Sequence, residues 1–259
     1  MTFPQIDPVI FSIGPLAVRW YGLMYLLGFV GGYFVMGHIA RLRDFPIGKE
    51  EISDLLFYGV FGVVAGGRLG YTLFYNADYY LSRPWEIVYV WEGGMSFHGG
   101  LLGVLAVLLF YCKKRKYSLL MIADLVVAAV PIGLGFGRLG NFINAELWGR
   151  PTDLPWGVVF PGAGPEPRHP SQLYEAGLEG LLLFVIIYLL HRRNVAPGVA
   201  GFSFLAFYGL FRFLVEFVRQ PDAHLGFLWA GATMGQLLSL PMLIAGAVGL
   251  FVLMKKDVQ

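Results

Sequence analysis

Residues 137–150, GRLGNFINAELWGR, place ionisable and amide side chains directly after a long apolar run. Guanidinium groups bind phosphate through planar, paired hydrogen bonds, a carboxylate accepts a proton or orients a hydroxyl, and amides both donate and accept. Ionisable groups at membrane depth are costly unless they are paired or line a wet cavity, so they mark functional sites. The segment therefore predicts an active or binding site, whose polar members are Arg138, Asn141, Asn144, Glu146 and Arg150.

A second polar group lies in a later apolar run, where Tyr208, Arg212, Glu216 and Arg219 are spaced four, four and three residues apart. In a helix this spacing puts them on one stripe. One reading is a structural ion pair between Arg212 and Glu216. The other is an arginine that faces a cavity admitting an anion.

Arg138 favours the second reading, because no carboxylate lies within one helical turn of it. Two arginines without enough local acids imply a bound anion, and guanidinium stays protonated in a poorly solvated site. At an outer membrane surface the abundant phosphate-bearing anions are phospholipid headgroups. The residues predict no metal site and no cofactor.

Three further sets of residues carry open alternatives. His98, in MSFHGGLLG, is either a structural histidine or a base that titrates near neutrality. Glu146 either pairs with Arg138 or Arg150, orients a substrate hydroxyl, or accepts a proton. Gln172, Glu175 and Glu179 share one face of a helix that begins near Pro170. They are read mainly as interior hydrogen-bonding groups, with substrate contact as the alternative.

The elements that must position these residues are membrane helices. Of the 259 residues, 57% are hydrophobic and 14% are charged, against roughly 45–50% apolar and about 25% charged in a soluble domain. The sequence predicts an all-α integral membrane protein, a bundle of about seven transmembrane helices. Their approximate ranges are 20–40, 55–74, 96–111, 119–136, 173–190, 199–218 and 232–254.

The lysines and arginines set the expected orientation. All six lysines fall in alternate connections on one side, which predicts a cytoplasmic C-terminus and a periplasmic N-terminus. The N-terminal segment before residue 20 has no basic region or cleavage site and is expected to be retained at the outer interface. The net charge of +2 gives no reason to expect nucleic acid as a partner.

No linker divides the chain, so residues 1–259 are expected to form a single membrane domain. Residues 141–170, between the fourth and fifth spans, contain six prolines and are expected to form a periplasmic loop or cap. The echo of GRLG at 67–70 and 137–140 is too short to indicate a repeat. The one cysteine, Cys112, is expected on the cytoplasmic side as a buried apolar residue.

Six segments together resemble the prolipoprotein diacylglyceryl transferases of bacterial inner membranes, in order along nearly the whole chain. They are FSIGPLAVRWYGLMY, GGRLGY, GGMSFHGGLLGV, GRLGNFINAELWGR, RHPSQLYE and YGLFRFLVEFVRQPDA. The resemblance implies a transferase of the bacterial inner membrane. It would move the diacylglyceryl group from phosphatidylglycerol to the lipobox cysteine of a preprolipoprotein signal peptide, form a thioether and release glycerol phosphate.

The resemblance also implies roles for individual residues. The essential arginines of the family correspond to Arg138 and Arg212, and His98 would be the base, with Glu146 in reserve. Substrate binding would fall to Tyr21, Asn141, Tyr208, Glu216, Arg219 and Gly149. Ala145 departs from the glycine expected in many relatives; this narrows the backbone slightly and leaves the chemistry unaffected. No enzyme cysteine is needed, because the substrate supplies the thiol.

Two other classes of protein fit parts of the pattern. A transporter or flippase for anionic phospholipid would also use interior arginines and glycine-rich helices, and would move headgroups without a covalent product. A non-catalytic scaffold that binds phosphatidylglycerol would not need His98 or Glu146.

Overall fold

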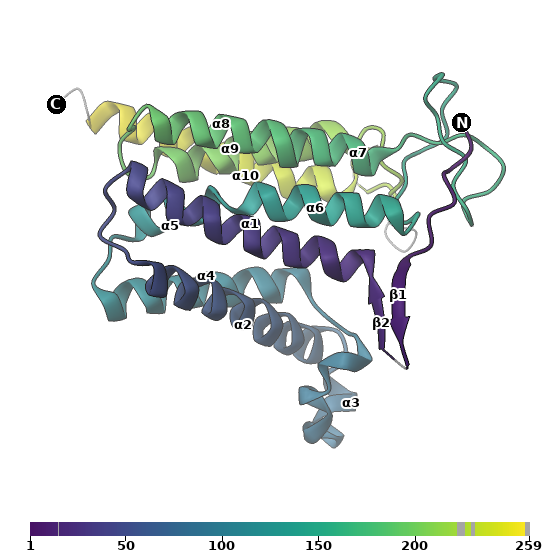
Figure 1. Cartoon of the computed structure of the whole chain (residues 1–259), viewed down its shortest axis with the longest axis horizontal. Helices are drawn as coiled ribbons and strands as arrows, with labels where there is room; N and C mark the ends of the chain where they lie inside the picture. The colour runs from purple at the N-terminus through teal and green to yellow at the C-terminus, as the bar shows by residue number, and fades with distance from the viewer. Residues whose placement is uncertain (15, 222–225, 229–230, 257–259) are drawn as a thin grey trace. The chain divides into compact units, whose positions relative to one another are not determined.

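The computed structural model describes residues 1–14, 16–221, 226–228 and 231–256 (Figure 1). The chain divides into two compact units, Met1–Asp44 with Asp124–Gln259, and Phe45–Ala123. We call them the first and second unit and describe each by itself. That the chain works as a single membrane domain stays a prediction.

The first unit is a helical bundle that carries most of the predicted site. Helix α1 (Trp20–Leu42) packs along α6 (Val130–Ile143). Next along the chain, α7 (Ser171–Glu175), the π-helical segment η3 (Ala176–Leu182) and α8 (Leu183–Arg192) form one continuous run. Helix α9 (Val199–Val215) packs against α10 (Met234–Lys256), and both are seen beside α8 in Figure 1.

Among the described residues, six helices are long and apolar enough to cross a membrane, and Val199–Val215 is a shorter apolar helix, which agrees with the expected membrane bundle. Several helices extend beyond the predicted spans. Helix α2 begins at Lys49 rather than 55, and the fourth span continues to Ile143 rather than 136. The hydropathy of a segment locates its apolar part, whereas helical hydrogen bonding continues into polar turns.

Two details fix where the helices of the first unit begin. Helix α5 (Leu119–Val127) stops before α6, which has Pro131 in its first turn, where a proline is favourable. Helix α9 is capped from a distance by Asp124, whose two carboxylate oxygens accept hydrogen bonds from the amides of Gly198 and Gly201, both at 2.7 Å. This completely buried carboxylate replaces a local N-cap side chain.

The second unit contains α2 (Lys49–Phe74), α3 (Ala77–Ser82), the short 3-10 turns η1 (Pro84–Val88) and η2 (Val90–Glu92), and α4 (Phe97–Arg115). Glycines let α2 and α4 approach closely: a Cβ on Gly62 would lie 2.9 Å from the carbonyl oxygen of Gly103, and one on Gly70 would lie 2.8 Å from Cα of Gly99. Arg68 is buried and donates to the carbonyls of Glu86 and Ile87, both at 2.8 Å, so it organises the turns.

The N-terminal segment contains an antiparallel hairpin of β1 (Val9–Ile13) and β2 (Leu16–Arg19), which the all-helical prediction omits. The predicted cap is a packed loop. Phe160 is 1% exposed and stacks with Trp148, and Phe3 contacts it from the N-terminus.

Candidate active site

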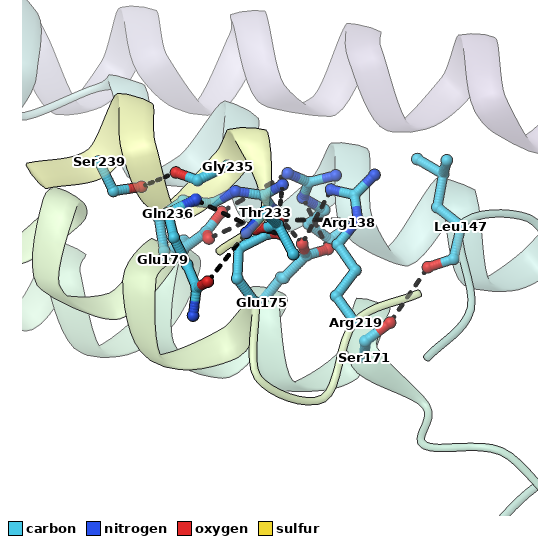
Figure 2. Close-up of polar contacts among 12 residues, drawn as sticks. Arg138, Leu147, Ser171, Glu175, Glu179, Arg219, Thr233, Gly235, Gln236 and Ser239 are labelled. Carbon is cyan, nitrogen blue, oxygen red and sulfur yellow. Dashed lines mark hydrogen bonds and ion pairs between the residues drawn. The ribbon is translucent and has the colours of Figure 1, made fainter. Parts of the chain in front are cut away.

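Glu175, the last residue of α7, is the carboxylate on which three arginines of the first unit converge (Figure 2). Its Oε2 lies 3.1 Å from Nε of Arg138, on α6. Its Oε1 accepts a hydrogen bond from Nη1 of Arg212, on α9, and lies 3.5 Å from Nη1 of Arg219. Glu175 is completely buried. One carboxylate therefore holds arginines from two helices and from the turn after α9.

Glu179 lies one turn further along the same run, in η3, and is also completely buried. Its Oε2 lies 3.6 Å from Nη2 of Arg138, and its Oε1 lies 3.9 Å from Nη1 of Arg212. Within the described part of the chain, neither oxygen accepts a hydrogen bond. Glu179 thus adds negative charge to the group without fixing the direction of a guanidinium.

Glu216 completes the group, which we call the arginine cluster: Arg138, Arg212, Arg219, Glu175, Glu179 and Glu216. Its Oε1 accepts a hydrogen bond from Nη2 of Arg212 at 2.5 Å. Its Oε2 accepts one from the hydroxyl of Thr233 at 2.6 Å. Thr233 immediately precedes α10, so the start of α10 is joined to the end of α9 through this carboxylate.

Sequence reasoning missed the residues that hold Glu216. The Thr233 amide donates to Oε1 of Gln236 at 3.0 Å, and the Gln236 amide donates to the Thr233 hydroxyl at 3.2 Å, which is a reciprocal capping box. A Cβ on Gly235 would lie 2.5 Å from Oε1 of Glu216, so a larger residue there would displace the Glu216 carboxylate. The spacing of threonine and glutamine before the last apolar run was the signal available in the sequence.

A close contact between backbones brings α6 and η3 together beside the cluster. A Cβ on Gly180 would lie 2.7 Å from Cα of Gly135. Arg138 follows Gly135 by less than one turn, and Glu179 adjoins Gly180. The glycine contact therefore explains how the guanidinium of Arg138 reaches carboxylates on another helix.

The inference that the arginines lack acids was wrong. The partners of Arg138 are Glu175 and Glu179, which lie far away in the sequence and come close only through helix packing. The structural ion pair of Arg212 with Glu216 is confirmed. Three arginines and three glutamates make the cluster formally neutral.

The arginines and the glutamates of the cluster differ in how far their side chains are buried. The side chains of Arg138, Arg212 and Arg219 are 17%, 15% and 11% exposed, whereas those of their glutamate partners are 0–4% exposed. The arginine side chains therefore keep some accessible surface, whereas the carboxylates keep almost none. Each guanidinium has five N–H donors in a planar fork, more than the carboxylates need. The arrangement is suited to present donors to an anion.

Tyr208 lies on α9 one turn before Arg212, and its ring stacks on Phe204 with centroids 5.6 Å apart. The predicted polar stripe is therefore only half helical, because Tyr208 and Arg212 lie on α9 whereas Glu216 is its C-cap and Arg219 follows in the turn beyond it. Tyr208 is partly buried, as are the guanidinium groups that follow it.

A second polar group lies at the end of α6. Nδ2 of Asn141 donates to Oε1 of Glu146 at 2.8 Å, and the Glu146 amide donates to the carbonyl of Asn141 at 3.0 Å. Among the described residues, Glu146 forms no ion pair with Arg138 or Arg150, so that reading was wrong. The asparagine amide satisfies its carboxylate instead. Tyr21 packs on this helix, since a Cβ on Gly140 would lie 3.0 Å from its ring.

Ala145, in the turn between these groups, has a φ of +53°. This left-handed conformation favours glycine. Alanine at this position therefore strains the backbone, whereas the sequence predicts only a slight narrowing of the space there.

Gly149 and Arg150, the last residues of the segment 137–150, connect this segment to the end of α9. The Gly149 amide donates to the His169 carbonyl at 2.9 Å, and a Cβ on Gly149 would lie 2.6 Å from the Val218 carbonyl oxygen. The Arg150 guanidinium donates through Nε to the carbonyl of Arg219 at 2.9 Å and through Nη2 to that of Glu216 at 3.0 Å. A cation that binds the carbonyls at a helix C-terminus stabilises that end.

His98 lies in the second unit, in the first turn of α4, and its side chain is exposed. Ser96 precedes the helix and accepts a hydrogen bond from the Gly99 amide at 3.2 Å, which fixes the turn that carries His98. The ring of His98 meets that of Phe97 edge to face at 5.6 Å. The role of His98 as a base stays a prediction.

Comparison with known proteins identifies the family. The sequence model described as prolipoprotein diacylglyceryl transferase matches residues 8–252. A phosphatidylglycerol–prolipoprotein diacylglyceryl transferase from Aeromonas hydrophila is 54% identical, over 98% of this chain and 93% of its own. Proteins of the same name from Geobacter sulfurreducens and Bordetella avium are each 55% identical, over 95% and 98% of this chain and 95% and 96% of their own. The chain therefore belongs to the prolipoprotein diacylglyceryl transferase family.

Proposed function

We propose that this protein transfers the diacylglyceryl group of phosphatidylglycerol to the thiol of the lipobox cysteine of a preprolipoprotein. The observation that carries the proposal is membership of the family over almost the whole chain, with relatives more than half identical that bear the name of this activity. The helices that could cross a membrane fit an enzyme whose lipid substrate resides in a bilayer.

The reaction exchanges one bond at a glyceryl carbon. The cysteine sulfur forms a bond to this carbon, and the bond from the carbon to the phosphate oxygen breaks. The oxygen keeps the electron pair and leaves as glycerol phosphate, while the thiol proton passes to a base. His98 is the proposed base and Glu146 the reserve, because a thiol of pKa about 8.5 needs an acceptor near neutral pH.

The arginines supply the electrostatic part of catalysis. Arg138 and Arg212 would bind the phosphate of phosphatidylglycerol and stabilise the negative charge that grows on the leaving oxygen. Preorganised donors of this kind usually contribute the largest share of a rate enhancement. Both arginine side chains keep some exposure while their carboxylate partners are completely buried, which supports this role.

Other residues would bind and orient the two substrates. Tyr21 and Asn141, together at the end of α6, would place the lipid, with Tyr208, Glu216, Arg219 and Gly149 contributing further contacts.

We place the protein in the bacterial inner membrane with the site toward the periplasm, since all six lysines fall on the opposite side of the predicted bundle.

One experiment tests the proposal. The purified full chain is incubated with phosphatidylglycerol and a lipobox peptide, and the peptide is analysed by mass spectrometry for a diacylglyceryl thioether. We expect the thioether with wild type and none with Arg138→Ala. Absence of the thioether from wild type, under conditions in which it binds the lipid, would overturn the proposal. Movement of labelled phosphatidylglycerol between leaflets without this product would favour the transporter.

A further inference from the structure

The geometry points to Glu175 as a positioning residue, one that holds the arginines in place for transfer without touching the substrate. The inference rests on the proposed function, because it concerns the same arginines. Glu175 is completely buried and contacts Arg138, Arg212 and Arg219 from a helix that carries none of them.

Oε1 of Glu175 accepts a hydrogen bond from Arg212 and lies 3.5 Å from Arg219, so it sets the direction of the Arg212 guanidinium. Oε2 forms an ion pair with Arg138 at 3.1 Å but accepts no hydrogen bond among the described residues, so the carboxylate lies between arginines of α6 and α9. Without it, like charges from these two helices would repel one another. Misplacing a catalytic group by about 1 Å costs roughly 100-fold in rate.

Glu179 provides a matched control. It is as buried as Glu175, lies one turn away, and carries the same charge near the same arginines. Its nearest guanidinium nitrogens are 3.6 Å and 3.9 Å away, and among the described residues none donates a hydrogen bond to it. Glu175→Gln and Glu179→Gln change the charge of the cluster equally, but only the first removes a directing contact.

This contrast separates positioning from charge and from structural support. Either substitution leaves the cluster with one excess positive charge, which should make binding of anionic phosphatidylglycerol equal to wild type or tighter. Glu175→Gln should nevertheless lower kcat about 100-fold. Glu179→Gln should lower it by less than about tenfold, since no directing contact is lost. A purely structural residue would lose lipid binding and turnover together.

The test measures kcat and the KM for phosphatidylglycerol by thioether formation, and binding with vesicles of phosphatidylglycerol in phosphatidylcholine. Thermal unfolding in detergent verifies that each variant is folded. Glu175→Asp keeps the charge but is one methylene shorter, and should show an intermediate kcat; it decides the question if Glu175→Gln does not fold.

Three outcomes would overturn the inference: wild-type kcat in Glu175→Gln, equal losses of kcat in Glu175→Gln and Glu179→Gln, or a parallel loss of lipid binding and kcat in folded Glu175 variants. Absence of product from wild type would instead refute the proposed function, so the two failures are distinguishable.

Discussion

Replacing Thr233 by valine tests whether the start of α10 holds the arginine cluster together. Valine has nearly the same shape as threonine but lacks the hydroxyl that donates to Glu216 at 2.6 Å and accepts from the Gln236 amide at 3.2 Å. The change therefore removes two hydrogen bonds and leaves a carboxylate oxygen unsatisfied in a site where Glu216 is 3% exposed.

The expected loss follows from these contacts. A hydrogen bond to a charged group contributes about 1.5–3 kcal/mol, and loss of a threonine cap costs about 1 kcal/mol. Together they predict that Thr233→Val lowers the free energy of unfolding by about 2.5–4 kcal/mol. Since Glu216 also binds Arg212, we expect turnover to fall at least about tenfold, a barrier change of about 1.4 kcal/mol.

The assay is unfolding by sodium dodecyl sulfate in mixed micelles, followed by tryptophan fluorescence, together with thioether formation. Thr233→Ser keeps the hydroxyl and is the control, with an expected loss below about 1 kcal/mol. If Thr233→Val unfolds within about 0.5 kcal/mol of wild type, the hydroxyl does not support the cluster and the reasoning is refuted.

Three other substitutions test separate parts of the framework, each by the same unfolding measurement. Gly149→Ala places a Cβ 2.6 Å from the Val218 carbonyl oxygen and should cost more than about 3 kcal/mol; a loss below about 1 kcal/mol would contradict this close approach. Asp124→Asn replaces one of the two accepting oxygens by an NH2 group, which would face a backbone N–H at the start of α9, and should lower the free energy of unfolding by about 2–3 kcal/mol. An unchanged stability would show that the distant cap is dispensable. Ala145→Gly relieves the strain of a left-handed residue with a φ of +53° and should stabilise the protein by about 0.5–1 kcal/mol. A fall in stability would show that the turn is not strained.

The membrane helices were predictable because their signal is local. The apolar runs located the spans, whereas the break between α5 and α6 near Pro131 was not predicted. The spacing correctly put Tyr208 and Arg212 on one helix, but α9 ends at Val215, so Glu216 and Arg219 reach the cluster from its C-cap and the following turn. The N-terminal hairpin was missed, although two apolar runs flank a turn at Gly14, whose φ is +58°. Its strands are short, and hydropathy does not distinguish them from an interfacial segment.

The partners of the arginines could not be predicted in the same way. A buried ionisable group must be paired, so the sequence did indicate that Arg138 and Arg212 require negative charge nearby. It did not say whether an acid of the chain or a bound anion supplies that charge. The answer depends on which helices pack against each other, and on which residues along each helix face one another.

Small residues determine how far one helix is shifted along its neighbour, and their importance appears only in the packed bundle. The contact of Gly135 with Gly180 puts Arg138 beside Glu175 and Glu179, and Gly235 leaves room for Glu216 against α10. A glycine in an apolar run has no obvious chemical role in the sequence, yet here it determines which charges meet. Under the proposed function, the buried carboxylates use part of each guanidinium, and the incoming phosphate would meet donors whose directions are already set. The acids that neutralise the arginines would then also position them for the anion.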